Sequence, residues 1–340
     1  MVNLLRLNIP VTSLLLCAPL TCSIALAQNQ ERPDLEGVWS NASLTSLTRP
    51  AGVESLVVSP EEARVIAAGV PIGGIEGGFD EGDGVNDTPD VAADDFGTRA
   101  YNNFWVDPGA SLALVKGEYR TSYIIDPANG QVPHLENPTV DFQRVSFGSR
   151  YVTGVGDASG PEALPLAERC IISDRRAGPA MQSALYNNTY QFVQTDDYVV
   201  INVEQIHDAR IIPTFDSAEE ARANRRPEVL QQYMGDSVGW YEDGTLVVET
   251  INVNPRQMQQ SSTAITANGR ITERFSRYAD NEIVYRFTVE DPGLYSQPWT
   301  AELSFYAIDG QLYEYACHEG NYSMPGTLAG ARRLEVDGQL

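Results

Sequence analysis

The amino-acid sequence predicts a mainly β protein whose strands form an antiparallel meander that closes as a barrel or stacks as a sandwich, with a few short helices. Two observations support this fold class. Short segments of alternating apolar and polar residues recur between residues 121 and 317, and turn signals rich in Gly, Asp and Asn separate them. Alternation with a period of two is the pattern of a half-buried strand, and closely spaced strands joined by tight turns are typical of barrels and sandwiches.

The individual strands follow from that alternation. Residues 190–195 and 198–204 are β-rich and are separated by two Asp residues, which predicts a hairpin. Residues 239–244 and 245–250 predict a second hairpin, with the Asp-Gly pair at 243–244 as its turn. Further strands are expected at residues 121–126, 271–278, 282–289, 299–306 and 311–317.

Helical signals are few. Ser59 precedes Pro60 and two Glu residues, which is the pattern of a capped helix start. Residues 217–223 and 227–233 carry similar signals. Residues 73–95 are acidic and Gly-rich with almost no large apolar side chain, so they predict a long solvated loop.

The amino-acid composition limits which classes of protein this chain can belong to. The chain has 340 residues, 42% of them hydrophobic, which is enough to build a core. It carries 46 acidic and 23 basic residues, a formal net charge of −23, so no basic face for phosphate groups is expected and nucleic acid is excluded as a partner.

The first 27 residues read as a secretory signal peptide. Arg6 supplies the positive charge, residues 11–26 are mostly apolar, and the Ala-Leu-Ala at 25–27 is a cleavage signal. A retained membrane anchor is the competing interpretation, but Pro10 and Pro19 interrupt the apolar stretch. We therefore expect a single β-rich domain over residues 28–340, periplasmic or secreted, with no membrane anchor after cleavage.

The mature chain then keeps two cysteines. Cleavage removes Cys17 and Cys22 and leaves Cys170 and Cys317. In an oxidising compartment two cysteines most simply form one disulfide. Two buried free thiols are the alternative.

Short strings in the chain resemble known families. Gly37-Val38-Trp39, near the expected mature start, resembles the G-x-W opening of lipocalin-type barrels, and this resemblance implies a lipocalin-like barrel. Four longer strings resemble a family of exported bacterial proteins, and that resemblance implies no activity. They are residues 101–109, the His-Asp-Ala-Arg at 207–210, residues 235–240 and the Tyr-Ala-Cys-His-Glu-Gly-Asn-Tyr at 315–322.

Each histidine is a candidate functional residue, because the chain has only three. His134 lies in a Pro-flanked loop and is expected to be exposed or to cap a turn. If the strand alternation continues through His207, this side chain shares the inward face with Val203 and Ile211, and Arg210 falls on the opposite face. An inward imidazole is either a hydrogen-bonded core residue or part of a ligand cavity.

His318 lies in the densest cluster of functional groups. Residues 313–322 hold a cysteine sulfur, the imidazole, the carboxylate of Glu319, the amide of Asn321 and three phenols. Such density at the expected end of a strand favours function. A structural role, in which His318 and Asn321 close a turn after a disulfide, stays open.

Known mechanisms fit these residues poorly. The zinc-protease pattern H-E-x-x-H fails because Tyr322 occupies the second His position. Ser237 lies in a string that matches G-x-S-x-G, but a hairpin is the wrong context for a hydrolase nucleophile. A metal site built from His207, His318 and a neighbouring carboxylate is a weaker alternative. We predict neither a metal nor an organic cofactor.

The sequence therefore favours an exported, cofactor-independent acid–base enzyme, a lyase or isomerase acting on a small, partly apolar organic molecule. His207 and His318 are the expected acid–base groups, with Arg210 and Glu319 orienting them or stabilising charge. The alternative is a periplasmic binding or carrier protein without catalysis, and a structural envelope module is a third hypothesis. The residues expected to contact the small molecule are Tyr186, Asn187, Asn188, Tyr190, Tyr315 and Asn321.

Overall fold

The computed structural model describes residues 32–70, 109–138, 158, 160–164, 166–172, 178–184, 186–254 and 263–338. The predicted signal peptide (1–27), the acidic loop (73–95) and residues 101–108 lie outside the described residues. Predictions that concern those segments are therefore neither confirmed nor contradicted.

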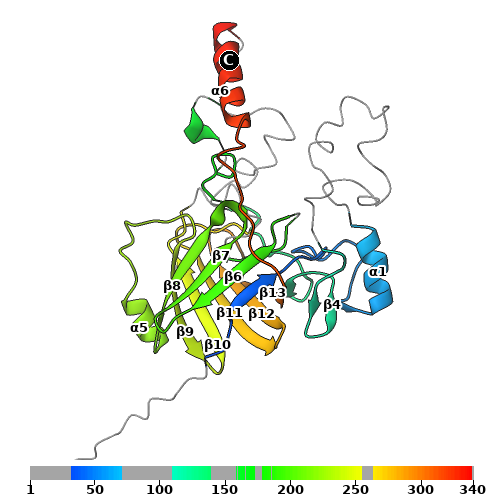
Figure 1. Cartoon of the computed structure of the whole chain (residues 1–340). Helices are drawn as coiled ribbons and strands as arrows, with labels where there is room; N and C mark the ends of the chain where they lie inside the picture. Colours follow the sequence, from blue (N-terminus) through cyan, green and yellow to red (C-terminus); the bar gives the residue numbers. More distant parts are fainter. Residues whose placement is uncertain are drawn as a thin grey trace, which may run out of the picture.

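Among the described residues, nine strands close into a mixed β-barrel (Figure 1). Strand β13 pairs with both β12 and β1, which closes the ring. The predicted mainly β fold and its closure as a barrel are confirmed. In spatial order the strands are β1 (Gly37–Ser40), β6 (Thr189–Gln194), β7 (Tyr198–Val203), β8 (Ala209–Phe215), β9 (Asp236–Glu242), β10 (Thr245–Ile251), β11 (Arg270–Ala279), β12 (Glu282–Glu290) and β13 (Trp299–Ala307).

One pair of barrel strands, β8 and β9, is parallel. The connection between them carries α5 (Ala218–Ala223), which returns the chain to the end of the barrel where β8 began. Ser217 caps this helix by accepting a 3.2 Å hydrogen bond from the Glu220 N–H, as its sequence predicts. Helix α5 covers the outer face of the barrel at Val238, Trp240 and Val247.

Beside the barrel lies a smaller unit (Figure 1). It is a sheet of β2 (Val57–Val58), β4 (Glu118–Arg120) and β3 (Leu114–Val115), accompanied by α1 (Pro60–Ala68). Ser59 and Glu62 form a capping box at the start of α1, which confirms that helix start. Strand β5 (Ile124–Asp126) joins the unit to the barrel by pairing with β13.

Aromatic side chains fill the interior of the barrel. Phe192 contacts Phe275 and Phe305 at ring-centroid distances of 5.7 Å each, and Tyr190 meets Phe305 edge to face at 4.9 Å. Trp39 on β1 belongs to the same buried cluster. These residues occupy the inward positions of their strands, so the described interior is a packed core.

Two predicted elements are wrong. Residues 227–233 form turns and a single bridge where a helix was expected, and residues 311–317 are irregular where a strand was expected. Helix α6 (Ser323–Val336) was not predicted, and the 3₁₀ turns η2 (Pro161–Ala163) and η3 (Gln205–His207) complete the described elements. Within the described part of the chain, no helix combines the length and the apolar character that crossing a bilayer requires.

Strands β8, β9, β11 and β13 begin at one end of the barrel, and β7, β10 and β12 end there. We call this the upper end, because it faces upward in Figure 1, toward α6. The barrel places the turn η3 and the start of β6 at this end, together with residues 252–253 and 291–298 that follow β10 and β12.

Candidate functional site

A buried polar cluster lies inside the barrel toward its upper end. Arg210 Nη1 donates to Glu273 Oε1 at 2.9 Å, and Nη2 donates to Glu273 Oε2. The phenol of Tyr285 donates to the same carboxylate at 2.6 Å. Ser237 and Thr250 share a 2.8 Å hydrogen bond, and both hydroxyls lie within 3.5 Å of Arg210 Nη2. Each of the strands β8 to β12 thus contributes one inward polar side chain.

Burial decides how this cluster ionises. The side chain of Glu273 has no exposed surface. Burial alone would lower the pKa of Arg210, but the charge of Glu273 and its hydrogen bonds outweigh this effect and raise the pKa. Burial, reinforced by the charge of Glu273, raises the pKa of Tyr285 well above its usual value. The guanidinium therefore stays charged and the phenol stays protonated, so the cluster is a fixed ion pair.

The segment 178–184 covers the cluster. Met181 N–H donates to the Tyr285 hydroxyl at 3.1 Å, and Gln182 Nε2 donates to Thr263 Oγ1 at 2.7 Å. Gly178 has a φ of +92°, and a Cβ at this position would lie 2.8 Å from Arg210 Nη1. Only glycine fits that close approach. The cluster is therefore closed to solvent on this side and organises the upper end of the barrel.

An open cleft of about 950 Å³ lies at the same end, beside the ends of β10, β11 and β12. Arg270 donates to Glu290 at 3.0 Å, and Asp291 accepts hydrogen bonds from the backbone N–H groups of Thr266 and Gly293, so these charged groups are already paired. The apolar part of the lining includes Val229, Pro292, Tyr295 and Pro298. Asn252, Tyr295 and Ser296 in the lining donate to backbone carbonyls. In the described part of the chain, no hydrogen bond engages the other four polar side chains, which are exposed: those of Glu228, Gln231, Asn268 and Gln297.

The predicted inward orientation of His207 is wrong. His207 is exposed, Ile211 is 57% exposed and Arg210 is 3% exposed. The turn η3 interrupts the strand, with Ile206 and His207 both at positive φ, and so resets the alternation. Arg210 then lies directly opposite Ile201 in the β7–β8 ladder, and opposite residues of an antiparallel pair point to the same face.

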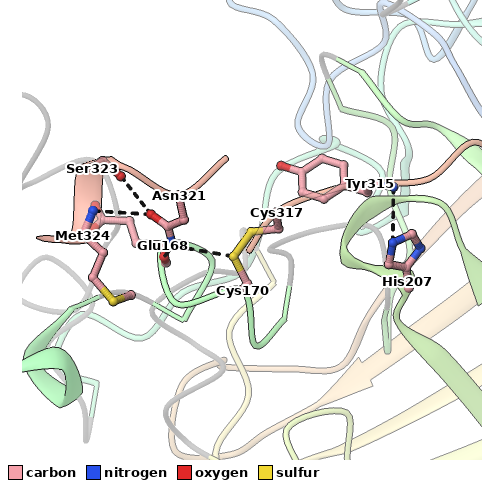
Figure 2. Close-up of a disulfide and its surroundings, with 8 residues drawn as sticks. All are labelled: Glu168, Cys170, His207, Tyr315, Cys317, Asn321, Ser323 and Met324. Carbon is pink, nitrogen blue, oxygen red and sulfur yellow. Dashed lines mark hydrogen bonds between the residues drawn. A yellow bond between two sulfur atoms is a disulfide. The ribbon is translucent and has the colours of Figure 1, made fainter. Parts of the chain in front are cut away.

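His207 contacts the C-terminal segment instead. Its Nε2 accepts a 3.2 Å hydrogen bond from the Tyr315 N–H (Figure 2). Two residues earlier, the Tyr313 N–H donates to Glu204 Oε1 at 3.4 Å. Since the bonded nitrogen is an acceptor, a neutral His207 carries its proton on Nδ1. The imidazole thus ties residues 313–315 to the upper end of the barrel.

The predicted disulfide between Cys170 and Cys317 is present, with a Cα–Cα distance of 5.8 Å. His318 and Glu319 follow it and are both exposed. Asn321 Nδ2 donates to the Glu168 carbonyl at 2.6 Å, so its amide joins two segments of backbone (Figure 2). His318 lies in a separate small pocket and not in the barrel interior, so the two imidazoles do not share an interior cavity.

The other predicted contact residues gather at the upper end, just before and at the start of β6. Tyr190 is fully buried among the interior aromatics, and the Asn188 amide closes a turn through 2.8 Å bonds to the backbone of Ala184. Asn187 adopts a positive φ of 55°, and Tyr186 is partly buried. None of the four lines the 950 Å³ cleft.

No three His, Cys, Asp or Glu side chains come close enough to hold a metal ion in the part of the chain that the structure describes. Comparisons of the chain with protein-family models, with curated proteins and with solved structures find no match. Function must therefore be argued from the geometry.

Sequence reasoning missed both the cleft and the interior cluster. The cleft is formed mostly by loop residues that carry no motif, with strand-end residues from β10, β11 and β12. One residue of the cluster could have been recognised in the sequence. Ile271 and Phe275, two residues before and after Glu273, are apolar, so Glu273 shares their face of the strand. A charged residue on the apolar face of a strand must point inward, where it needs a hydrogen-bonding or oppositely charged partner.

Proposed function

We propose that the protein is an exported binding protein that takes a small, polar, partly apolar organic molecule at the cleft beside β10, β11 and β12. The observation that carries this proposal is a set of exposed side chains that line the cleft and make no hydrogen bond within the described residues: Glu228, Gln231, Asn268 and Gln297. Polar groups that converge on a concave surface next to apolar ones are typical of small-molecule sites. Export follows from the signal peptide that the sequence predicts.

The charges of the lining favour a neutral or cationic ligand. Three carboxylates, of Glu228, Glu290 and Asp291, face a single guanidinium, and Arg270 is already paired with Glu290. An anion would meet Glu228, and the described lining offers no second cation to balance that carboxylate. Hydroxyl or amino groups on the ligand would match the amide and carboxylate acceptors.

Binding is better supported than catalysis. A general base needs a free lone pair within reach of the substrate, and the Tyr315 N–H occupies the Nε2 lone pair of His207. His207 and His318 are both exposed, outside the barrel interior. Lyase or isomerase activity stays a prediction, and it requires that H207A and H318A abolish turnover of a bound compound while leaving its affinity intact.

A binding screen tests the proposal. The oxidised mature protein is screened by thermal shift against matched neutral, cationic and anionic small molecules, and the strongest stabiliser is titrated by calorimetry. We expect a single site for a neutral or cationic compound. N268A and Q297A should each weaken the affinity about fivefold, because each variant removes one hydrogen bond worth about 1 kcal/mol.

Q311A is the matched control, since Gln311 is exposed and lies outside the cleft. Its affinity should equal that of the wild type. The proposal fails if no neutral or cationic compound stabilises the protein, or if Q311A weakens binding as much as Q297A does.

A further inference from the structure

A second pocket, of about 430 Å³, lies beside the disulfide. One wall is the loop that ends at Cys170, and the other is the segment that follows Cys317. The Asn321 side chain fixes the two walls together: its Nδ2 donates to the Glu168 carbonyl, and its Oδ1 accepts from the Ser323 hydroxyl at 3.1 Å and from the Met324 N–H at 3.3 Å (Figure 2). The pocket is thus held by one covalent and several hydrogen bonds.

The lining combines two nitrogen-containing groups with an apolar surface. Besides Asn321, it consists of Arg169, His318, Pro161, Ile171, Met324 and Pro325. The Asn321 amide is occupied by the bonds that hold the walls, so Arg169 and His318 are the polar groups that a ligand can engage. The other four side chains provide the contact surface for an apolar body.

Arg169 differs from the other arginines that the structure describes. Arg120, Arg210, Arg225 and Arg286 all pair with carboxylates. Within the described residues, no hydrogen bond or ion pair engages the Arg169 side chain, and the same holds for the His318 imidazole. The described lining contains no Asp or Glu, although the chain has 46 acidic residues.

We propose that this pocket binds a small carboxylate with an apolar body, such as a short-chain fatty acid. A guanidinium can bind a carboxylate through two parallel hydrogen bonds, and an imidazole supplies an N–H donor whether neutral or charged. Pro161, Ile171, Met324 and Pro325 would bury the hydrocarbon. The site is separate from the cleft of the proposed function and has the opposite charge preference.

Hexanoate is the test probe, and hexanamide is its neutral match in shape. Binding to the oxidised mature protein is followed by NMR and by calorimetry in low-salt buffer, where a half-exposed cation is little screened. We expect hexanoate to saturate one site with a dissociation constant of about 1 mM or below, and hexanamide to bind at least about tenfold more weakly. R169Q should weaken the affinity for hexanoate by about tenfold or more, and H318Q should also weaken it.

R333Q is the matched control, because Arg333 lies on α6, pairs with Asp337 and is outside the pocket. It should leave hexanoate binding unchanged, as should N268A in the cleft. Equal melting temperatures and absence of free thiols show that R169Q and H318Q keep the fold and the disulfide. Equal affinity for hexanoate and hexanamide, retained affinity in R169Q, or tighter binding of inorganic phosphate than of hexanoate overturns the proposal.

Discussion

At the scale of single residues, the interior ion pair is the most consequential feature. Arg210 and Glu273 are buried together. The Glu273 carboxylate accepts from Arg210 and Tyr285, and Arg210 also donates to the hydroxyls of Ser237 and Thr250. Removing a charge from water costs several kcal/mol, which only a well-bonded partner repays. The pair therefore commits these strands to one register.

Removing one partner should be far worse than removing both. We expect E273Q to lower the free energy of unfolding by about 3–5 kcal/mol, because it leaves Arg210 buried without a counter-charge. The double variant R210M/E273Q should lose less than E273Q alone. Urea denaturation followed by circular dichroism measures both values.

An exposed ion pair provides the comparison. Glu61 and Arg64 are 72% and 75% exposed, so E61Q should change the stability by less than about 1 kcal/mol. If E273Q were as mild as E61Q, the interior pair would not determine the stability of the barrel.

The residue scale also shows where sequence reasoning failed. The identity of the important residues near His207 was predictable, but their orientation was not. Two residues at positive φ, Ile206 and His207, shift the alternation and exchange the expected positions of His207 and Arg210. Ile206 is β-branched, a residue type that rarely adopts a positive φ, so the alternating pattern did not indicate this turn.

At the scale of elements, Glu302 on β13 connects the barrel to the small sheet. It accepts from Arg286 at 2.7 Å within the barrel and from Lys116 at 3.2 Å beside β4. Burial alone would raise the pKa of Glu302, but the hydrogen bonds and charges of Arg286 and Lys116 outweigh it and lower the pKa. Hydrogen bonds and charges of Arg222 and Arg225 likewise outweigh burial at Glu249 and lower its pKa.

These lowered pKa values predict acid sensitivity. As the pH falls below the ordinary Glu value of 4.5, the unfolded chain takes up protons before Glu302 does in the folded state. The stability that Glu302 contributes is therefore complete above that value and is lost as the pH falls through its lower folded-state pKa. Urea titrations between pH 7 and pH 3 should show this loss, and E302Q should reduce it.

E302Q should also cost about 1.5–3 kcal/mol at pH 7, where it removes hydrogen bonds to a charged acceptor. E335Q, which removes an exposed partner of Arg332, should leave both the stability and its pH dependence unchanged. A pH profile of E302Q that matches the wild type would contradict this assignment.

The C-terminal segment is a second element whose attachment can be tested. Residues 313–315 are held by Glu204 and His207, and the disulfide follows at Cys317. We expect reduction, or the C170S/C317S variant, to speed hydrogen exchange in residues 313–322 while the barrel amides stay protected. The loop of 147 residues makes the disulfide worth at most about 5 kcal/mol.

The H207A variant distinguishes the contribution of the His207 hydrogen bond from that of the disulfide. With the disulfide intact, it should speed exchange at Tyr315 alone, because only that N–H loses its acceptor. If reduction leaves the hydrogen-exchange rates of residues 313–322 unchanged, the disulfide does not hold the segment.

Local pattern explains which elements were predictable. The hairpins β6–β7 and β9–β10 combine alternation with a two-residue turn, so their sequences determine them. Residues 311–317 also alternate, but β13 already pairs with β1, β5 and β12, so no free edge is left for another strand there. Helix α6 was missed because Pro325, Gly326 and Gly330 lower its helix propensity.

At the scale of the whole molecule, closure of the barrel keeps the chain compact, whereas the net negative charge disfavours the compact state. Strand β1 closes the ring: its four residues pair with β6, and Trp39 and Ser40 also pair with β13. A formal net charge of −23 repels itself more strongly in the compact folded chain than in the unfolded one.

Salt should therefore stabilise the protein. At 10 mM ionic strength charges interact over about 30 Å, whereas at 150 mM the range falls to about 8 Å. Screening removes long-range repulsion and affects the close, partly buried pairs much less. We expect the melting temperature at pH 7 to rise by about 2–4 °C for each kcal/mol of repulsion removed, and NaCl and KCl should act equally because the effect depends on ionic strength. A melting temperature that falls with added chloride would show that exposed ion pairs, and not the net charge, dominate the electrostatic free energy.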